Sequence, residues 1–137
     1  MKGIKKYPRK PSGILLAVLL LCLSVAVPAR AVGLISGRYL SRTATKFTLE
    51  IKIGSPAPAS LIIIQHLPPG TAPASANPPY KKYSAKKGEV RWLLSNVQAG
   101  VITVHLKLTA PVKPNQLSAE IRCMDPSTGK PVTTQVK

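Results

Sequence analysis

Four carboxylates are the side chains in this chain that could form a catalytic acid–base pair: Glu50, Glu89, Glu120 and Asp125. General acid–base and glycosidase chemistry needs two carboxyl groups held close together. Glu50 and Glu120 occupy outward positions of expected strands, and the other two adjoin expected turns. We therefore interpret all four as solvated partners for the surplus of lysine and arginine.

Two histidines, His66 and His105, and the thiol of Cys123 are too few for the usual metal sites, because the other cysteine, Cys22, lies in the apolar N-terminal run. A closed zinc site takes about four ligands, and a catalytic one takes three with a water. A nucleophilic Cys–His pair would need Cys123 beside a histidine in a cleft, but its inward position at a strand end predicts a buried, inert thiol. The isolated glycines precede no helix and form no phosphate-binding loop. We expect no metal, no cofactor and no enzyme activity.

A cluster of lysines and tyrosines is the one pattern that suggests a binding surface. Clustered ammonium groups attract polyanions, and aromatic rings beside them can pack on sugars or lipids. An anionic envelope polymer or an acidic protein would suit such a surface. The alternative is a solvated loop whose lysines keep the protein soluble and deter strand pairing. The cluster, here called the basic segment (residues 80–87), contains Tyr80, Lys81, Lys82, Tyr83, Lys86 and Lys87.

The N-terminus has the three parts of a bacterial-type export signal. Five of the 20 lysines and arginines lie within the first ten residues, and an uncharged, mostly apolar run follows. Small residues, Ala29 and Ala31, then stand where a signal peptidase requires them, so we predict a signal peptide over residues 1–31 that is cleaved after Ala31. An uncleaved membrane anchor is the less favoured alternative, because a spanning helix needs roughly 20 apolar residues and Pro28 interrupts the run.

Export determines the compartment of the protein and excludes cytosolic molecules as its partners. The protein is expected in the periplasm or outside the cell, where it would meet no cytosolic nucleic acid and would touch a membrane only through the signal peptide before cleavage. The mature chain, residues 32–137, has the length of one domain. It keeps a single cysteine, Cys123, so no intrachain disulfide can form and packing must stabilise the fold.

Alternating apolar and polar residues predict β-strands throughout the mature chain. The alternation is clearest at residues 46–53, 89–94, 101–108 and 116–123, and weaker strands are expected at 38–42, 71–77 and 131–136. Residues 60–67 are apolar without alternation, which indicates a strand covered on both sides or one at a twisted sheet edge. Glycine and proline clusters separate these runs, and the sequence PPG at 68–70 predicts a type II turn.

Seven or eight short strands at this spacing favour an all-β fold, a single antiparallel sandwich of two sheets. A closed barrel is the alternative, because strand patterns alone do not distinguish the two. Trp92 is the only tryptophan, and its inward position predicts a core anchor between the sheets. A ligand-stacking role is the less favoured interpretation, since stacking rings usually lie on loops or exposed faces.

The order of several short runs resembles one known family. The runs are FTLEIKI at 47–53, PAPASLIII at 56–64, LPPG at 67–70, GEVRWLL at 88–94 and NVQAG at 96–100. Together they are similar to the conserved repeat domain of bacterial surface proteins, domain of unknown function eleven, over about residues 38–110. The resemblance implies an immunoglobulin-like sandwich used as a spacer or adhesive module, with no catalytic residues.

Two functional hypotheses follow from the sequence. The first is an exported, non-enzymatic, immunoglobulin-like sandwich that acts as a structural or interaction module at the cell envelope or outside the cell. The second is a binding protein for an anionic polymer or ligand, with the basic segment as its contact. Salt distinguishes them, because polyanion binding through lysines weakens steeply as ionic strength rises.

Overall fold

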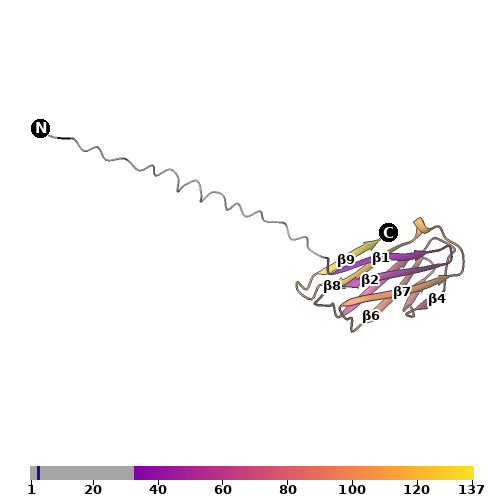
Figure 1. Ribbon diagram of the computed structural model, residues 1–137. Coiled ribbons are helices and arrows are strands. Elements are labelled where there is room, and N and C mark those ends of the chain that lie inside the picture. Colours follow the sequence, from indigo (N-terminus) through magenta and orange to yellow (C-terminus); the bar gives the residue numbers. More distant parts are fainter. Residues whose placement is uncertain (1–2, 4–32) are drawn as a thin grey trace. The chain divides into compact units, whose positions relative to one another are not determined.

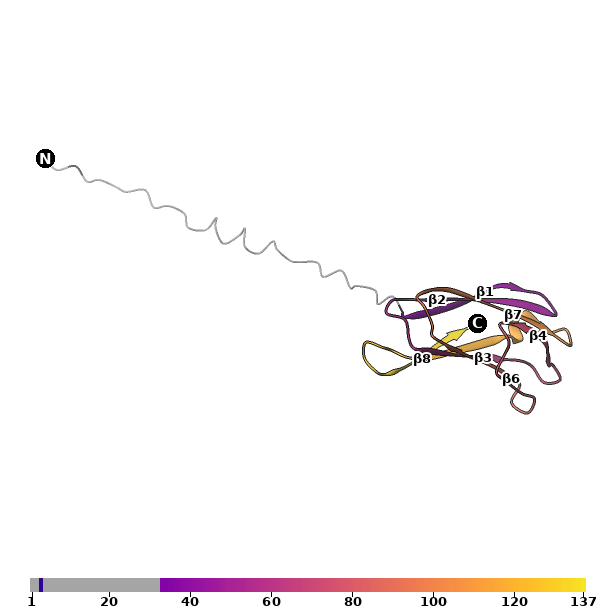
Figure 2. The same ribbon diagram turned by 90° about the horizontal axis from the view of Figure 1, so that it is seen from below.

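Nine β-strands form two antiparallel sheets that pack face to face in the described part of the chain (Figures 1 and 2). The structure is a computed structural model, and it describes Gly3 and residues 33–137. Apart from Gly3, the predicted signal peptide, residues 1–31 with cleavage after Ala31, lies outside the described residues. Residues 33–137 belong to a single compact unit, and their all-β sandwich confirms the fold class expected from the alternation.

Each sheet brings together strands that are distant in the sequence. The four-stranded sheet has the order β1-β2-β7-β4, and the five-stranded sheet has the order β5-β6-β3-β8-β9. Both sheets have two free edges, so neither closes into a barrel. The strands are β1 (Ile35–Arg42), β2 (Lys46–Ile53), β3 (Ser60–His66), β4 (Pro73–Asn77), β5 (Lys82–Ser84), β6 (Glu89–Ser95), β7 (Gly100–Leu108), β8 (Ser118–Met124) and β9 (Pro131–Val136).

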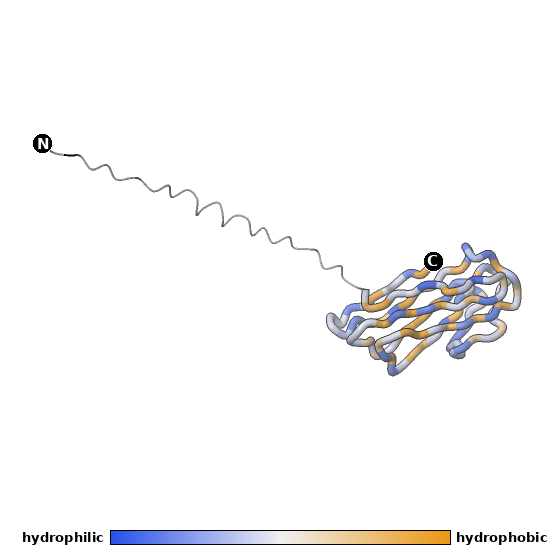
Figure 3. The backbone as a smooth tube through the Cα atoms, viewed as in Figure 1, coloured by the Kyte–Doolittle hydropathy of each residue, from blue (hydrophilic) through white to orange (hydrophobic). Residues whose placement is uncertain are grey.

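The period of two in the sequence decides which side chains enter the space between the sheets. In β2 the apolar set is buried while its polar neighbours face outward, because successive side chains of a strand point to opposite faces. Figure 3 shows the same alternation of apolar and polar residues along the strands. The buried residues of β2 are Phe47, Leu49, Ile51 and Ile53.

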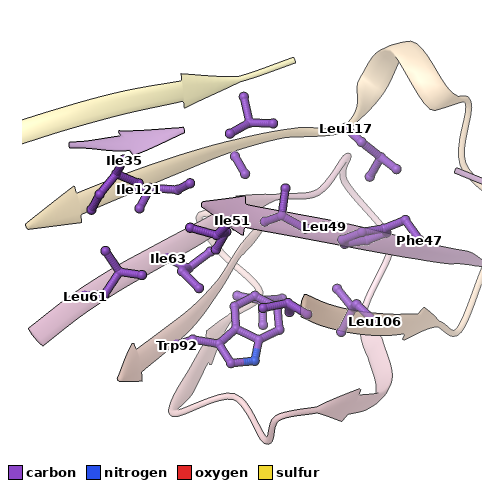
Figure 4. Packing of buried hydrophobic residues seen from close by; sticks show 14 of the residues in the cluster. Ile35, Phe47, Leu49, Ile51, Leu61, Ile63, Trp92, Leu106, Leu117 and Ile121 are labelled. Carbon is purple, nitrogen blue, oxygen red and sulfur yellow. The ribbon is translucent and has the colours of Figure 1, made fainter. Parts of the chain in front are cut away.

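Trp92 belongs to the hydrophobic cluster between the sheets (Figure 4). Only 1% of its surface is exposed. Its indole Nε1 donates a hydrogen bond of 2.8 Å to the carbonyl oxygen of Pro78, which satisfies the one polar atom of the ring. The segment that leads from β4 to the basic segment is thereby attached to the core.

The basic segment, the strand β3 and the turn at Gly70 can each be compared with what the sequence predicts. The basic segment is not a loop throughout, because β5 (Lys82–Ser84) lies within it and pairs with β6. The strand β3 is central in its sheet, between β6 and β8, so the edge-strand interpretation of residues 60–67 is wrong. Coverage on both sides is found only in part, because the outward residue Ile64 is buried whereas Ile62 is exposed. At the expected turn, Gly70 has φ +80°, and the amide of Thr71 donates to the Pro68 carbonyl over 3.3 Å.

A polar pair spans the apolar interior between the sheets. Gln65 of β3 is completely buried, and its Oε1 accepts a hydrogen bond of 2.9 Å from the Tyr39 hydroxyl of β1. Its amide nitrogen donates to the carbonyls of Ser118 and His66 over 2.9 and 3.1 Å. Gln65 therefore enters the core with its side-chain polar atoms satisfied, as a buried amide must.

The titration of Tyr39 should make stability depend on alkaline pH. Burial raises the pKa of Tyr39 to about 12, although the Gln65 hydrogen bond and the Arg42 charge oppose the increase. Because the neutral phenol is favoured in the folded state, its contribution is complete below pH 10 and is lost as the pH rises towards 12. We expect wild type to lose about 2 kcal/mol relative to Tyr39→Phe over this range, measured by urea unfolding. A constant difference between the two proteins would contradict the burial of this hydroxyl.

Candidate functional site

The glutamates of the described sandwich are paired with arginines on its outer faces. These exposed pairs contribute little to stability, but they occupy the carboxylates. Glu89 and Glu120 are separated by the intervening strand β3, and Glu50 lies in the other sheet, so no two glutamates lie on adjacent strands. The ion pairs are Arg38–Glu50 (2.9 Å), Arg91–Glu89 (3.3 Å) and Arg122–Glu120 (2.7 Å).

Two of the carboxylates have further roles that are structural. A hydrogen bond of 2.9 Å from Gln135 lowers the pKa of Glu120, and its pairing with Arg122 lowers it further. Asp125 accepts a hydrogen bond of 2.8 Å from the amide of Ser127 within the turn before β9. Both groups therefore have local partners that explain their positions.

The two histidines lie on opposite outer faces of the sandwich, and the cysteine lies in its core. His66 is on the outer face of the five-stranded sheet, where its Nδ1 lies 3.9 Å from Glu89. His105 is on the outer face of the four-stranded sheet, and Cys123 points into the core. Burial raises the pKa of the Cys123 thiol, and the Asp125 carboxylate raises it further. Across residues 33–137 no three metal-binding side chains come together.

The basic segment supplies the first strand, β5, and most of the turn of a hairpin whose second strand is β6. Register places Lys82 opposite Arg91 and Ser84 opposite Glu89, and the amide of Lys81 continues the pairing by donating to the Arg91 carbonyl over 2.7 Å. At the tip, Gly88 has φ +64°, a conformation that favours glycine. The hairpin is therefore held by backbone hydrogen bonds up to its turn.

The two tyrosines of the basic segment attach it to the body of the sandwich. The Tyr83 hydroxyl donates a hydrogen bond of 3.0 Å to the carbonyl of Thr71, and its ring packs against the core cluster. Tyr80 packs edge-to-face on Trp92, with ring centroids 6.5 Å apart. Tyr83 is half-buried, but Tyr80 remains 37% exposed while it packs on Trp92, so the segment presents its lysines and part of the Tyr80 ring to solvent.

The four lysines of the basic segment are all exposed. A small hollow of about 90 Å³ lies beside the hairpin and is lined by Lys82, Ser84, Lys87, Glu89 and Arg91. Arg91 neutralises Glu89 in this hollow. The charges of Lys82 and Lys87 are therefore not balanced, and the hollow carries an excess of positive charge. Its volume suits one small anionic group and not a whole substrate, as expected for a contact on a longer polymer.

Arg91 is the member of this site that the sequence analysis missed. The alternation in residues 89–94 places Arg91 outward, and that was the available signal. Arg91 lies beside Lys82 only because β5 pairs with β6, and the register of that pairing places the two residues opposite each other. A strand of three residues inside a lysine-rich segment gives no periodicity from which that pairing could be inferred.

The turn of the hairpin provides a test of its packing. A Cβ on Gly88 would lie 2.5 Å from the carbonyl oxygen of Leu67, whereas one on Gly129 would meet nothing within 4 Å. Both glycines have similar positive φ, +64° and +69°, so the backbone strain that alanine introduces should be about equal at the two positions. We expect Gly88→Ala to lower the free energy of unfolding by about 1–3 kcal/mol more than Gly129→Ala. Equal losses in urea unfolding would contradict the close approach of Leu67.

Comparisons with known proteins were made for the whole chain. No family model, no curated protein and no solved structure matches it. No helix in the described residues combines the length and the apolar character that crossing a membrane requires. The resemblance to the surface-repeat domain therefore stays a prediction from the sequence, and what is shown of this chain is an antiparallel β-sandwich of a four-stranded and a five-stranded sheet.

Proposed function

We propose that the protein is an exported, non-enzymatic β-sandwich that acts as an interaction module at the cell envelope or outside the cell, and that its partner is an anionic polymer. The contact is the basic segment, residues 80–87. The observation that carries this proposal is that the four lysines of the basic segment are exposed on a strand-paired hairpin, and that none of them forms an ion pair with a carboxylate in the described residues.

The glutamates pair with arginines and not with lysines, which supports a polyanion contact through the lysines. Arginines neutralise the three glutamates, and no lysine forms an ion pair with a carboxylate among residues 33–137. The ammonium groups are therefore available to a negatively charged chain, which would release its condensed counterions on binding. Attachment through Tyr80 and Tyr83 reduces the conformational entropy that the segment loses when it binds.

We also propose that the sandwich is of the immunoglobulin type. An immunoglobulin constant domain has strands A, B, E and D in one sheet and C, F and G in the other. With β1 to β4 as A to D and β7 to β9 as E to G, the sheet orders here have the same neighbours. The hairpin of β5 and β6 is then an addition beside strand C. Trp92 lies on that addition and not on strand C, which departs from the immunoglobulin pattern.

Exchange of the four lysines tests the contact. In K81Q/K82Q/K86Q/K87Q, we expect affinity for heparin and for lipopolysaccharide to fall by at least about tenfold at low salt, because counterion release is lost. The salt dependence of log K should flatten by about 1 for each contacting lysine. Both quantities are measured by fluorescence anisotropy over about 50–200 mM salt.

The matched control removes four lysines elsewhere, in K52Q/K113Q/K130Q/K137Q. This variant has the same net charge as the hairpin variant but keeps the basic segment. If both variants lost affinity equally, binding would follow net charge alone and the contact assigned to residues 80–87 would be wrong. Unchanged affinity in the hairpin variant would also exclude that contact.

Export has its own test. Expressed in a Gram-negative host, the protein should be recovered from the periplasm or the medium with Val32 as its first residue, because Ala29 and Ala31 fit the signal-peptidase pocket. N-terminal sequencing and mass spectrometry measure this directly. Replacing both alanines with leucine should leave the precursor uncleaved. Full-length wild-type precursor in the cytoplasm would contradict export.

A further inference from the structure

The outer face of the four-stranded sheet carries a second basic surface, whose two lysines, Lys46 and Lys107, lie outside the basic segment. A shallow hollow of about 370 Å³ lies over strands β2, β4 and β7. All of its outward-facing side chains are polar or charged and most are exposed. We call these residues the sheet-face site: Lys46, Thr48, Ser75, Asn77, His105 and Lys107.

Two lysines of the sheet-face site lie directly opposite each other. The register of β2 with β7 pairs Lys46 with Lys107, and side chains opposite one another across a sheet have Cβ atoms about 5 Å apart. Like charges in this arrangement destabilise a sheet. The one carboxylate on the outer face of this sheet, Glu50, is held by Arg38 at 2.9 Å. A bound anion would therefore relieve a repulsion that no side chain on this face relieves.

The groups around the two lysines are those that bind hydroxyl-rich ligands. The Thr48 hydroxyl and His105 Nδ1 lie 3.1 Å apart in a hydrogen bond, and register places Asn77 beside His105 and Ser75 beside Lys107. Hydroxyl, amide and imidazole groups donate and accept hydrogen bonds, so they suit sugar hydroxyls. Phe47, the aromatic residue at the hollow, is 2% exposed, so the face lacks the stacking platform that single-stranded nucleic acid uses.

The sheet-face site and Lys82 of the basic segment lie on the outer faces of different sheets. Tyr83 faces the core, so its strand neighbour Lys82 projects from the outer face of the five-stranded sheet, together with Arg91. Figure 2 shows the two sheets as separate layers, and the outer face of one layer is turned away from that of the other. One straight polymer chain cannot contact both surfaces at once.

We propose that the sheet-face site binds a second chain of an acidic polysaccharide, so that one domain bridges two polymer chains. The inference rests on the proposed function, because the basic segment supplies the first contact. Lys46 and Lys107 bind the carboxylate or sulfate, and the neighbouring polar side chains bind the sugar hydroxyls. The domain then acts as a cross-link, which binding through one surface does not provide.

The test separates binding from bridging. Heparin and polygalacturonate are the sulfated and carboxylated probes, and dextran is the neutral control. Affinity and stoichiometry are measured by calorimetry, and bridging by light scattering as protein is added to polymer. The face variant is K46Q/K107Q, the hairpin variant is K81Q/K82Q/K86Q/K87Q, and the charge-matched control for the face is K113Q/K130Q.

Wild type and K113Q/K130Q should bridge heparin, polygalacturonate or both, with scattering that rises and then falls at excess protein. K46Q/K107Q should keep binding through the basic segment with about half the sites, and its scattering should fall by about tenfold, because two contacts per domain are required to link chains. Its melting temperature should equal or exceed that of wild type, since the substitution removes a repulsion. Reduced scattering therefore cannot be attributed to unfolding.

Three results would overturn the inference. If K46Q/K107Q bridged as well as wild type, the sheet-face site would be excluded while the proposed function stood. If K113Q/K130Q lost bridging equally, net charge and not this site would be responsible. If wild type bound neither acidic polysaccharide, the proposed function and the second site would both fail.

Discussion

Burial of the inward-facing apolar side chains between the two sheets is the interaction on which the rest of the described structure depends. The single cysteine in these residues is unpaired, so no disulfide supports the sandwich. Burying a side chain the size of leucine or isoleucine contributes roughly 1.5–3 kcal/mol, and a cluster of such residues from both sheets fills the interior. Trp92 joins this cluster from β6, with its indole nitrogen satisfied by Pro78.

The same packing decides what the outer surfaces carry. Because every second residue of a strand must point outward, each apolar set that enters the core presents a polar set to solvent. On β2 that set includes Lys46, Thr48 and Glu50. Three of the four arginines in residues 33–137 pair with glutamates across or along the strands, and Arg42 donates to the Pro114 carbonyl. The exposed lysines remain, and the functional proposals concern two groups of them.

The alternation in the sequence predicted the all-β class, most strands and their inward faces, because it reports a local property of each strand. The inward set of β2 and the positive φ of Gly70 were both correct. Pairing between distant strands has no such local signal. The sequence shows Lys46 and Lys107 as outward residues, but only the register of β2 with β7 makes them opposite neighbours. The short β5 was missed for a similar reason, since three residues carry too little periodicity.

The hydrogen bond between Tyr39 and Gln65 has a consequence for the uniqueness of the fold. Apolar side chains of similar size pack acceptably in several alignments, so a purely aliphatic interior would tolerate sliding of one sheet over the other. A one-residue slip of β3 would turn Gln65 to the outside and leave the phenol of β1 without an acceptor in a nonpolar medium. This directional hydrogen bond therefore fixes the alignment of the two sheets. It selects one relative placement of the two layers, and with it one arrangement of the charges displayed on their exteriors.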